Sequence, residues 1–302
     1  MELIKPLTNI DFVGKMKLAF TISLIMIVIS IASVVLHGGL NLGIDFAGGT
    51  LVQIKFQKET TTESLRSALK SIQLESSIIQ KLGSQEVVIR AAESTPDLQG
   101  LSSRIEEALN TAYGKGGFEV RRVEVVGPKV GRDLTNKAIM AIIFSWIGML
   151  VYIAWRFELR YAVGGIIALI HDVIITVGAL SLLNKEFTLT IIAALLTIVG
   201  YSINDTIVIY DRIRENTRKG IKKDLGEIMN VSINETLGRT ILTSLTVFTV
   251  LAVLFFLGGE VIHDFAFAML VGVISGVYST VYIASPLVLA WEYFRPSQTR
   301  KR

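Results

Sequence analysis

Residues 187 to 210 read FTLTIIAALLTIVGYSINDTIVIY, and this stretch contains a single charged side chain, Asp205. About 20 helical residues cross the hydrocarbon core of a bilayer, so the stretch predicts a transmembrane helix. An aspartate at the centre of such a helix costs roughly 2.5–3.5 kcal/mol on insertion scales, and carboxylates at this depth tend to mark ion pathways. The stretch therefore predicts a helical membrane protein and names one candidate functional residue.

Five further runs have the same apolar character. None is shorter than 18 residues, and the only charged or histidine side chains inside them are His171 and Asp172. The sequence therefore predicts a polytopic α-helical membrane protein with six transmembrane helices, the first being a retained anchor rather than a cleaved signal peptide. The six runs are 18–36, 138–155, 161–184, 187–210, 240–259 and 265–291.

The composition of the chain agrees with this class. Among its 302 residues, 51% are hydrophobic and only 19% are charged, whereas a soluble chain carries about 25% charge. The net charge of +4 is small and dispersed, which argues against nucleic-acid binding. The absence of cysteine excludes disulfides, thiolate metal sites and a cysteine nucleophile. With three histidines in the chain, we expect neither a metal site nor a cofactor.

Lys and Arg in the short segments between the runs predict the orientation. The segments on the side of the N-terminus carry most of them, for example at 212–223, whereas the short loops on the other side carry only Lys185. Both termini are therefore predicted to be cytoplasmic. Residues 218–236 have the spacing of an amphipathic helix on the membrane surface, although a solvated basic loop would also fit.

The expected organisation is a cytoplasmic N-terminus at 1–17, transmembrane helix 1 at 18–36, an extracytoplasmic domain at 37–136, helices 2–6 within 137–291 with a cytoplasmic amphipathic segment at 211–237, and a cytoplasmic tail at 292–302.

The insert at 37–136 is long enough for a small domain. Alternation predicts two strands, and two further short stretches, separated by a Gly83-Ser84 turn signal, are also typical of strands. Two other stretches have helical spacing. The order β-α-β-β-α-β is that of a ferredoxin-like α+β sandwich between helices 1 and 2, a fold that fixes no function. A binding surface and a structural cap both remain open. The strands are expected at 50–57, 77–82, 86–91 and 118–126, the helices from Thr61 and from Pro96-Asp97, and burial at Phe118, Val120, Val123 and Val125.

Two glycine-bearing segments flank this domain. Residues 43–50 read GIDFAGGT and residues 127–133 read GPKVGRD. Glycine permits backbone conformations that other residues avoid, so the two segments could act as joints on which the domain swings; two stiff turns would have a similar sequence. The candidate joint residues are Gly43, Asp45, Gly48, Gly49, Gly127 and Gly131.

Polar residues inside the apolar runs are the candidates for chemistry. Tyr201 and Asp205 share a helix face with Thr197, and Asn204 is adjacent, so this helix could load and release a proton; a helix–helix hydrogen bond is the alternative. Arg239 could pair with Asp205 or simply extend to the membrane surface. For His171 and Asp172 a proton relay, a structural hydrogen bond and a packing pair all remain open. Small residues every fourth position in the last run predict close helix packing: Ala268, Gly272, Gly276, Thr280 and Ala284.

Together these motifs resemble one known family. The motifs that carry the resemblance are GIDFAGGT after the first run, VGPKVGRDL before the second, HDV in the third, GYSINDTIVIYDRIREN from the fourth and GRTILTS at the fifth. The chain resembles the SecF branch of the SecD/SecF family of bacterial protein-export membrane subunits. The resemblance covers nearly the whole chain, and GYSINDT…DRIREN is its most specific part.

The resemblance implies a function that composition alone does not give. Members belong to the resistance-nodulation-division superfamily, pair with SecD, associate with the SecYEG channel and YajC, and use the proton-motive force to complete export of unfolded preproteins across the plasma (inner) membrane. It implies proton transport by Asp205 and Arg239, with Asp172, Asn204 and Tyr201 as further candidates. A superfamily transporter of small molecules or lipids and a non-conducting scaffold for SecD are the competing functions, and no enzyme activity is expected.

Overall fold

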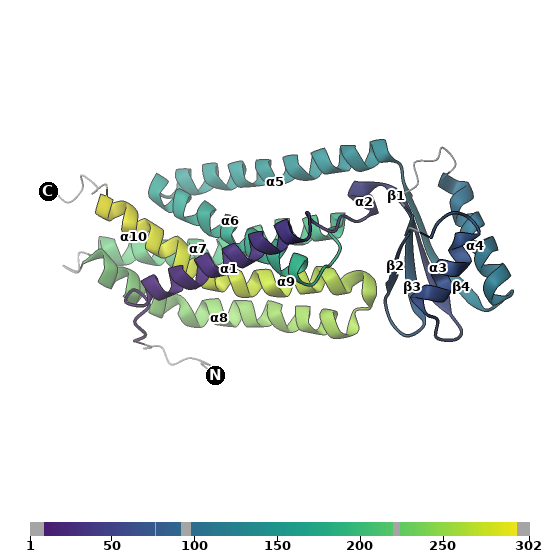
Figure 1. Ribbon diagram of the computed structural model, residues 1–302. Coiled ribbons are helices and arrows are strands. Elements are labelled where there is room, and N and C mark those ends of the chain that lie inside the picture. The colour runs from purple at the N-terminus through teal and green to yellow at the C-terminus, as the bar shows by residue number, and fades with distance from the viewer. Residues whose placement is uncertain (1–8, 76, 92–97, 220–223, 295–302) are drawn as a thin grey trace. The chain divides into compact units, whose positions relative to one another are not determined.

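The computed structural model describes residues 9–75, 77–91, 98–219 and 224–294 (Figure 1). Its internal contacts divide the chain into two compact units. One comprises residues 42–140, and the other comprises the chain up to Asn41 and from Ala141 onward. The first eight residues, the expected helix start at Pro96-Asp97 and the tail from residue 295 lie outside the described residues.

The unit of residues 42–140 contains one antiparallel sheet with the spatial order β2-β3-β1-β4. Two helices alternate with its strands along the chain and lie on one side of the sheet (Figure 1). This confirms the predicted βαββαβ order. The elements are α2 (Ile44–Ala47), β1 (Gly49–Phe56), α3 (Thr62–Lys70), β2 (Ile78–Lys81), β3 (Glu86–Ala91), α4 (Leu98–Tyr113) and β4 (Phe118–Val126).

The core of this unit lies between the sheet and the two helices. Ile54 and Ile89 from the sheet and Leu65 and Ile105 from the helices have no exposed surface. The alternation of β1 produces this arrangement, because every second side chain of a strand points to the same face. Helix α3 starts where the sequence predicts, since the Oγ1 atom of Thr61 accepts a hydrogen bond from the backbone N–H of Ser64 at 3.2 Å.

The burial expected along β4 is only half right. Phe118 and Val120 pack against the core, but Val123 is 43% exposed and Val125 is 38% exposed. The strand lies at the edge of the sheet and its register with β1 shifts between Gln53 and Ile54. Alternation alone does not show how far along the strand the helices cover the sheet. The predicted burial of Val123 and Val125 was therefore wrong.

The second unit is a bundle of helices. In the ranges that the structure describes, six helical spans are long and apolar enough to cross a membrane. This confirms the predicted number. Three spans are mostly buried inside the unit, namely the third, the fourth and the sixth. The spans are α1 (Met16–Leu36), α5 (Pro128–Arg156), α6 (Leu159–Leu182), α7 (Leu189–Arg218), α8 (Leu225–Leu257) and a last one made of α9 (Glu260–Ser279), the π-helical segment η1 (Thr280–Ala284) and α10 (Ser285–Phe294).

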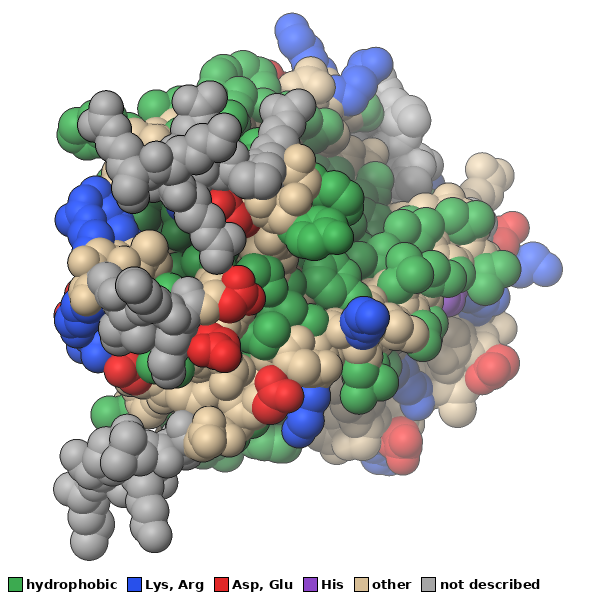
Figure 2. Space-filling view, turned by 90° about the vertical axis from the view of Figure 1, so that its left-hand side faces the viewer, with side chains coloured by type: hydrophobic (Ala, Val, Ile, Leu, Met, Phe, Trp, Pro, Cys, Tyr) green, Lys and Arg blue, Asp and Glu red, His purple; other side chains and the backbone are tan. Residues whose placement is uncertain are grey.

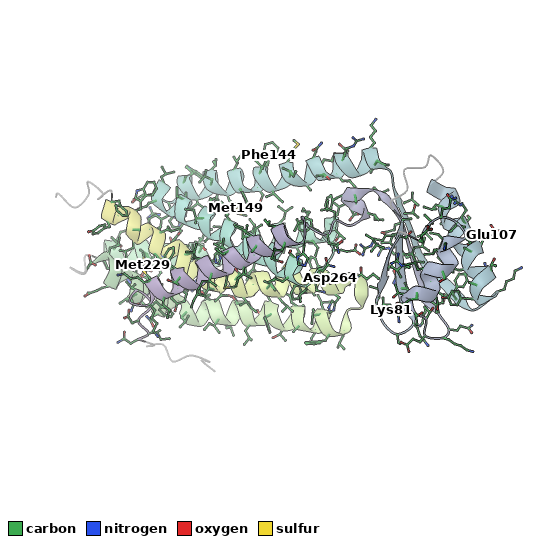
Figure 3. All side chains as sticks on the ribbon, in the orientation of Figure 1. Lys81, Glu107, Phe144, Met149, Met229 and Asp264 are labelled. Atoms are coloured by element: carbon green, nitrogen blue, oxygen red, sulfur yellow. The ribbon has the colours of Figure 1, made fainter. Side chains whose placement is uncertain are left out.

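Helices α5 and α8 expose most of their apolar surface. Phe144 on the outer side of α5 is 63% exposed (Figure 3), and Phe256 on α8 is 78% exposed. Contiguous apolar surface of this extent requires lipid or a partner protein to cover it. The small residues predicted to pack do so within the chain, because a Cβ atom on Gly276 of α9 would lie 3.1 Å from the side chain of Ser202 on α7.

The cytoplasmic segment expected at 211–237 is not a separate surface helix. Its first part continues α7 to Arg218, and its second part from Leu225 is the beginning of α8. The buried amide of Asn216 donates to Ser232 at 3.0 Å and to Glu235 at 2.7 Å, and Arg212 pairs with Glu235 at 2.6 Å. These bonds pair the polar faces of the two helices with each other, so the segment extends the bundle. Lys222 and Lys223 lie outside the described residues.

The two glycine-bearing segments pack against each other. Residues 44–47 form the short helix α2, which has Asp45 in its first turn, and the residues from Pro128 onward are the first turns of α5 rather than a loop. Gly48 and Gly49 have positive φ angles of 74° and 117°, which glycine adopts readily. A Cβ atom on Gly131 would lie 2.9 Å from the carbonyl oxygen of Phe46. This geometry favours stiff turns over free joints at Gly43–Gly49 and Gly127–Gly131.

We therefore predict that Gly131→Ala destabilises the sheet unit. The new methyl group meets a backbone carbonyl that has to shift, and overpacking of this kind costs about 1–3 kcal/mol. Gly127→Ala is the matched control, because a Cβ atom there has no neighbour within 4 Å. Hydrogen exchange of β1 and β4 in the full chain measures both variants. Equal protection in Gly131→Ala and in the unsubstituted protein would contradict the close packing.

Candidate functional site

The carboxylate of Asp172 on α6 is completely buried and accepts hydrogen bonds from three serines. Ser202 of α7 and Ser279 of α9 donate to its Oδ2 atom at 2.7 and 2.8 Å. Ser275 of α9 donates to Oδ1 at 2.6 Å. Hydrogen bonds to a charged group contribute about 1.5–3 kcal/mol each, so this carboxylate joins α6, α7 and α9 at one point inside the bundle.

His171 extends the same cluster towards α1. Its Nδ1 atom lies 3.1 Å from Oδ1 of Asp172, and its ring stacks on Tyr278 with centroids 6.1 Å apart. The Tyr278 hydroxyl donates to the Ala19 carbonyl at 2.6 Å and accepts from Ser23 at 3.1 Å. The structure thus places His171 and Asp172 in one buried hydrogen-bonded cluster that reaches three neighbouring helices.

Asp205 on α7 is also buried, with 3% of its surface exposed, but it has far fewer partners. Among the described residues its carboxylate accepts one hydrogen bond, from the hydroxyl of Ser244 on α8 at 3.3 Å. The Tyr201 hydroxyl donates to the same Ser244 oxygen at 3.3 Å. The structure therefore brings Tyr201 and Asp205 together around a serine of the neighbouring helix.

The other candidates of this region lie on exposed surface. Asn204 and Thr197 are exposed on α7, and the Thr197 hydroxyl bonds to the carbonyl of Ala193 in its own helix. Arg239 on α8 is exposed, and the structure gives no ion pair between it and Asp205. Arg239 precedes Ser244 by five residues, which is roughly 7–8 Å along a helix. The pairing considered from the sequence is therefore not present in this conformation.

Helix α7 consequently has two polar faces with different roles. On one face Ser202 bonds to Asp172, Thr206 lies 2.9 Å from the hydroxyl of Thr280, and Tyr210 donates to the Ala284 carbonyl at 3.2 Å. These contacts fasten α7 to α6 and to the last span. On the other face Asp205 accepts a single bond of 3.3 Å from Ser244 of α8, and Tyr201 donates to the same hydroxyl.

Sequence reasoning missed the hydroxyl donors. A serine in an apolar run is common and satisfies itself by bonding to its own helix, so no single one stands out. One signal was available. Ser275 and Ser279 are four residues apart and therefore share a helix face, and two serines on one face of an apolar helix indicate a polar partner opposite that face. The residues missed were Ser202, Ser244, Ser275 and Ser279.

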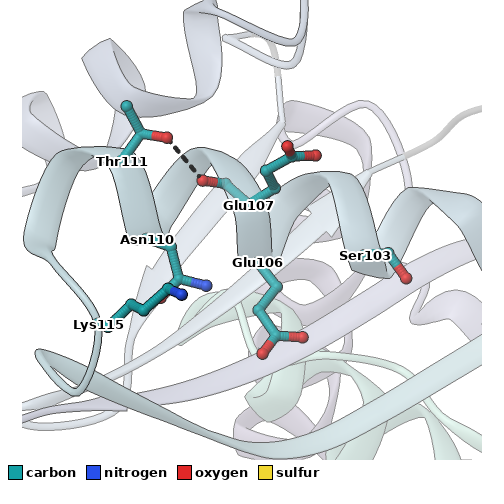
Figure 4. Close-up of a pocket in the computed structure, with 6 residues that line it drawn as sticks. All are labelled: Ser103, Glu106, Glu107, Asn110, Thr111 and Lys115. Carbon is teal, nitrogen blue, oxygen red and sulfur yellow. Dashed lines mark hydrogen bonds between the residues drawn. The ribbon is translucent and has the colours of Figure 1, made fainter.

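The described residues of the sheet unit show no comparable convergence of polar groups. A depression of about 420 Å³ lies along α4 (Figure 4). In this view the carboxylates of Glu106 and Glu107 point in different directions, and Thr111 donates to a carbonyl of its own helix at 3.0 Å. Within the described ranges no group of three or more His, Asp or Glu side chains is placed to hold a metal ion.

Comparisons with known proteins decide the family. The family model described as "Protein export membrane protein SecD/SecF, C-terminal" matches residues 105–293, and the model "SecD/SecF GG Motif" matches residues 34–60. The chain belongs to the SecD/SecF family. Two relatives are named "Protein translocase subunit SecF". The one from Calditerrivibrio nitroreducens is 50% identical over 95% of this chain and 96% of its own length. The one from Magnetococcus marinus is 46% identical over 100% of this chain and 97% of its own length.

Solved structures of SecDF proteins share the fold. The crystal structure of SecDF from Thermus thermophilus, a translocon-associated membrane protein, matches with a TM-score of 0.87 and 36% identity over 96% of this chain. A SecDF structure in a super-membrane-facing form matches with a TM-score of 0.72 and 37% identity over 100% of it. The chain spans 40% and 41% of those two chains. The SecF-like part of SecDF is thus one portion of a longer polypeptide.

The bonding of the two aspartates predicts unequal effects on stability. Asp172→Ala leaves three buried serine hydroxyls without their acceptor, at about 1–3 kcal/mol for each, whereas Asp205→Ala leaves one. We expect the unfolding temperature of the purified protein to fall clearly in Asp172→Ala and only slightly in Asp205→Ala. The control is Ser275→Ala, which removes one of the three bonds and should cost about 1.5–3 kcal/mol. An equal or larger fall in Asp205→Ala would contradict this assignment.

Proposed function

We propose that this chain is the SecF subunit of a bacterial Sec protein translocase and that it couples ion movement at Asp205 to the export of polypeptides. The observation that carries the proposal is the contrast between the two buried carboxylates. Asp172 is saturated by hydroxyl donors, whereas Asp205 accepts one bond of 3.3 Å. A carboxylate that binds and releases an ion has to leave its partners at low cost, and only Asp205 satisfies this condition.

The proposed cycle begins with proton binding at Asp205. Protonation removes its charge and weakens the bond from Ser244, so the contact between α7 and α8 changes while the opposite face of α7 stays fastened to Asp172. One charge crossing 100 mV releases roughly 2.3 kcal/mol. A shift of this size biases a two-state equilibrium without making it irreversible, so several protons per exported chain are required.

Arg239 acts in the same cycle as a counter-charge. In this conformation it lies exposed on α8, where its charge would face lipid unless a partner covers it, and burying an unpaired arginine is costly. A carboxylate of SecD opposite this face would satisfy it. Asn204 is exposed on the adjacent helix and would belong to the same contact, which places the ion path close to the boundary between two subunits.

The partners and the location follow from the family and the charge pattern. Pairing with SecD is supported by the SecDF structures, in which the matching part is joined to further chain. Association with SecYEG and YajC is proposed on family grounds. The bias of Lys and Arg supports a plasma (inner) membrane protein with both termini and the 211–237 segment in the cytoplasm. The sheet unit, at residues 37–136 in the expected organisation, would then act outside, where it meets the emerging preprotein.

The proposal is tested by restoring export in a host depleted of its own SecF. The unsubstituted chain, Asp205→Asn and the control Asp211→Asn are compared by pulse-chase of a secreted protein, with co-purification of SecD as the assembly check. Asp211 lies on the same helix but is exposed and paired with Arg156 at 3.2 Å. We expect Asp205→Asn to assemble with SecD but to restore little export, and Asp211→Asn to restore it fully.

Equal export by all three chains would contradict ion coupling at Asp205. The chain would then be a scaffold for SecD, since the helical bundle would be needed but its buried carboxylate would not. Loss of SecD from Asp205→Asn would also contradict the proposal, because it would make Asp205 an assembly residue.

A further inference from the structure

A basic pocket lies at the end of the helical unit where α5 and α7 end. Its volume is about 630 Å³, which is in the range of small-molecule sites. Figure 2 looks onto this end of the bundle and shows Lys and Arg side chains gathered along its left edge. The pocket is lined by Arg156, Asp211, Arg214, Glu215, Arg218 and Lys219.

The charges of this pocket do not cancel. Asp211 pairs with Arg156 at 3.2 Å, and Glu215 pairs with Lys219 at 2.8 Å. In the part of the chain that the structure describes, Arg214 has a bond of 3.4 Å to the Arg156 carbonyl but no carboxylate partner, and Arg218 has no ion pair. Two guanidinium groups are therefore available to an anion, and arginine binds phosphate oxygens through paired N–H donors.

The position of the pocket indicates where the anion comes from. Arg156 ends the apolar run of α5, and its neighbour Trp155 is 87% exposed. Tyr152, one turn earlier, is 49% exposed. Aromatic side chains of this kind concentrate at the boundary between membrane and water. The ion pair between Arg156 and Asp211 holds the ends of the two apolar runs at the same level, so the pocket lies at headgroup depth.

We propose that this pocket binds the phosphate of an anionic membrane phospholipid. Arg214 and Arg218 hold the phosphate, Arg156 forms the wall on α5, and Trp155 lies beside the acyl chains. Basic pockets between helices on the cytoplasmic side are suited to such headgroups. A bound lipid would add a link between the ends of α5 and α7, beside an apolar stretch of α5 that is mostly exposed. The ion-coupling proposal is not required for this inference.

The test measures lipid occupancy of the full-length protein by native mass spectrometry. Three probes are added separately to protein in an uncharged detergent: phosphatidylglycerol, phosphatidylcholine with the same acyl chains, and inorganic phosphate. The variant Arg214→Gln/Arg218→Gln removes the free guanidinium groups. The matched control is Lys15→Gln/Lys17→Gln, which removes two exposed charges on the same side of the membrane at α1. Thermal unfolding without lipid verifies that both variants are folded.

We expect phosphatidylglycerol to bind the unsubstituted protein and the lysine control equally. The arginine variant should bind it roughly 30-fold more weakly, as expected for two basic residues at a membrane surface. Phosphatidylcholine should bind weakly to all three. Competition by inorganic phosphate would support the phosphate chemistry and assign the pocket to a soluble anion as well. Equal loss in both double variants, or no loss in the arginine variant, would overturn the proposal.

Discussion

Three serine hydroxyls from α7 and α9 converge on the carboxylate of Asp172, and this cluster fixes how the central helices of the bundle meet. In lipid, helices gain little from apolar contact with one another, so packing of small residues and hydrogen bonds determines their arrangement. Both are present here. Gly276 of α9 lies close to Ser202, and the stacked pair of His171 and Tyr278 extends the cluster to α1.

The cluster around Asp172 holds α7 on one side only. Helix α7 is fastened to α6 and to the last span on the side of Ser202, Thr206 and Tyr210. On its other side it meets α8, where Asp205 accepts one bond from Ser244 and where Tyr201, Arg212 and Asn216 also bond to α8. A change of charge at Asp205 therefore acts on the contact with α8 rather than on the centre of the bundle. Under the proposed function, the difference in bonding separates the two buried aspartates: Asp172, with three hydroxyl donors, anchors the bundle, and Asp205, with one, exchanges an ion.

Much of the fold could be predicted from the sequence because it depends on local patterns. Uninterrupted apolar length predicts the six spans. Alternation predicts the strand at Phe118–Val126, and the turn signal at Gly83-Ser84 marks the start of the strand at Glu86–Ala91; the structure has both strands at these residues. Prediction failed where the outcome depends on distant partners. The helical pairing of Asn216 with Ser232, the packing of Gly131 on Phe46 and the exposure of Val123 are set by segments far away in the chain. The candidate site behaved in the same way: Asp172 and Asp205 were both found, but their different numbers of hydrogen bonds depend on serines from other helices.

Proton exchange at Asp205 can be measured by infrared spectroscopy of the SecD-bound protein, following with pH the C=O band of a protonated carboxyl group in an apolar setting. We expect one such band whose intensity changes with pH in the unsubstituted protein, and the same band in a Ser275→Ala variant, where one bond to Asp172 is removed but Asp205 is untouched. The band should be absent from Asp205→Asn. A band that persists unchanged in Asp205→Asn would show that another carboxyl group exchanges the proton and would contradict the central claim.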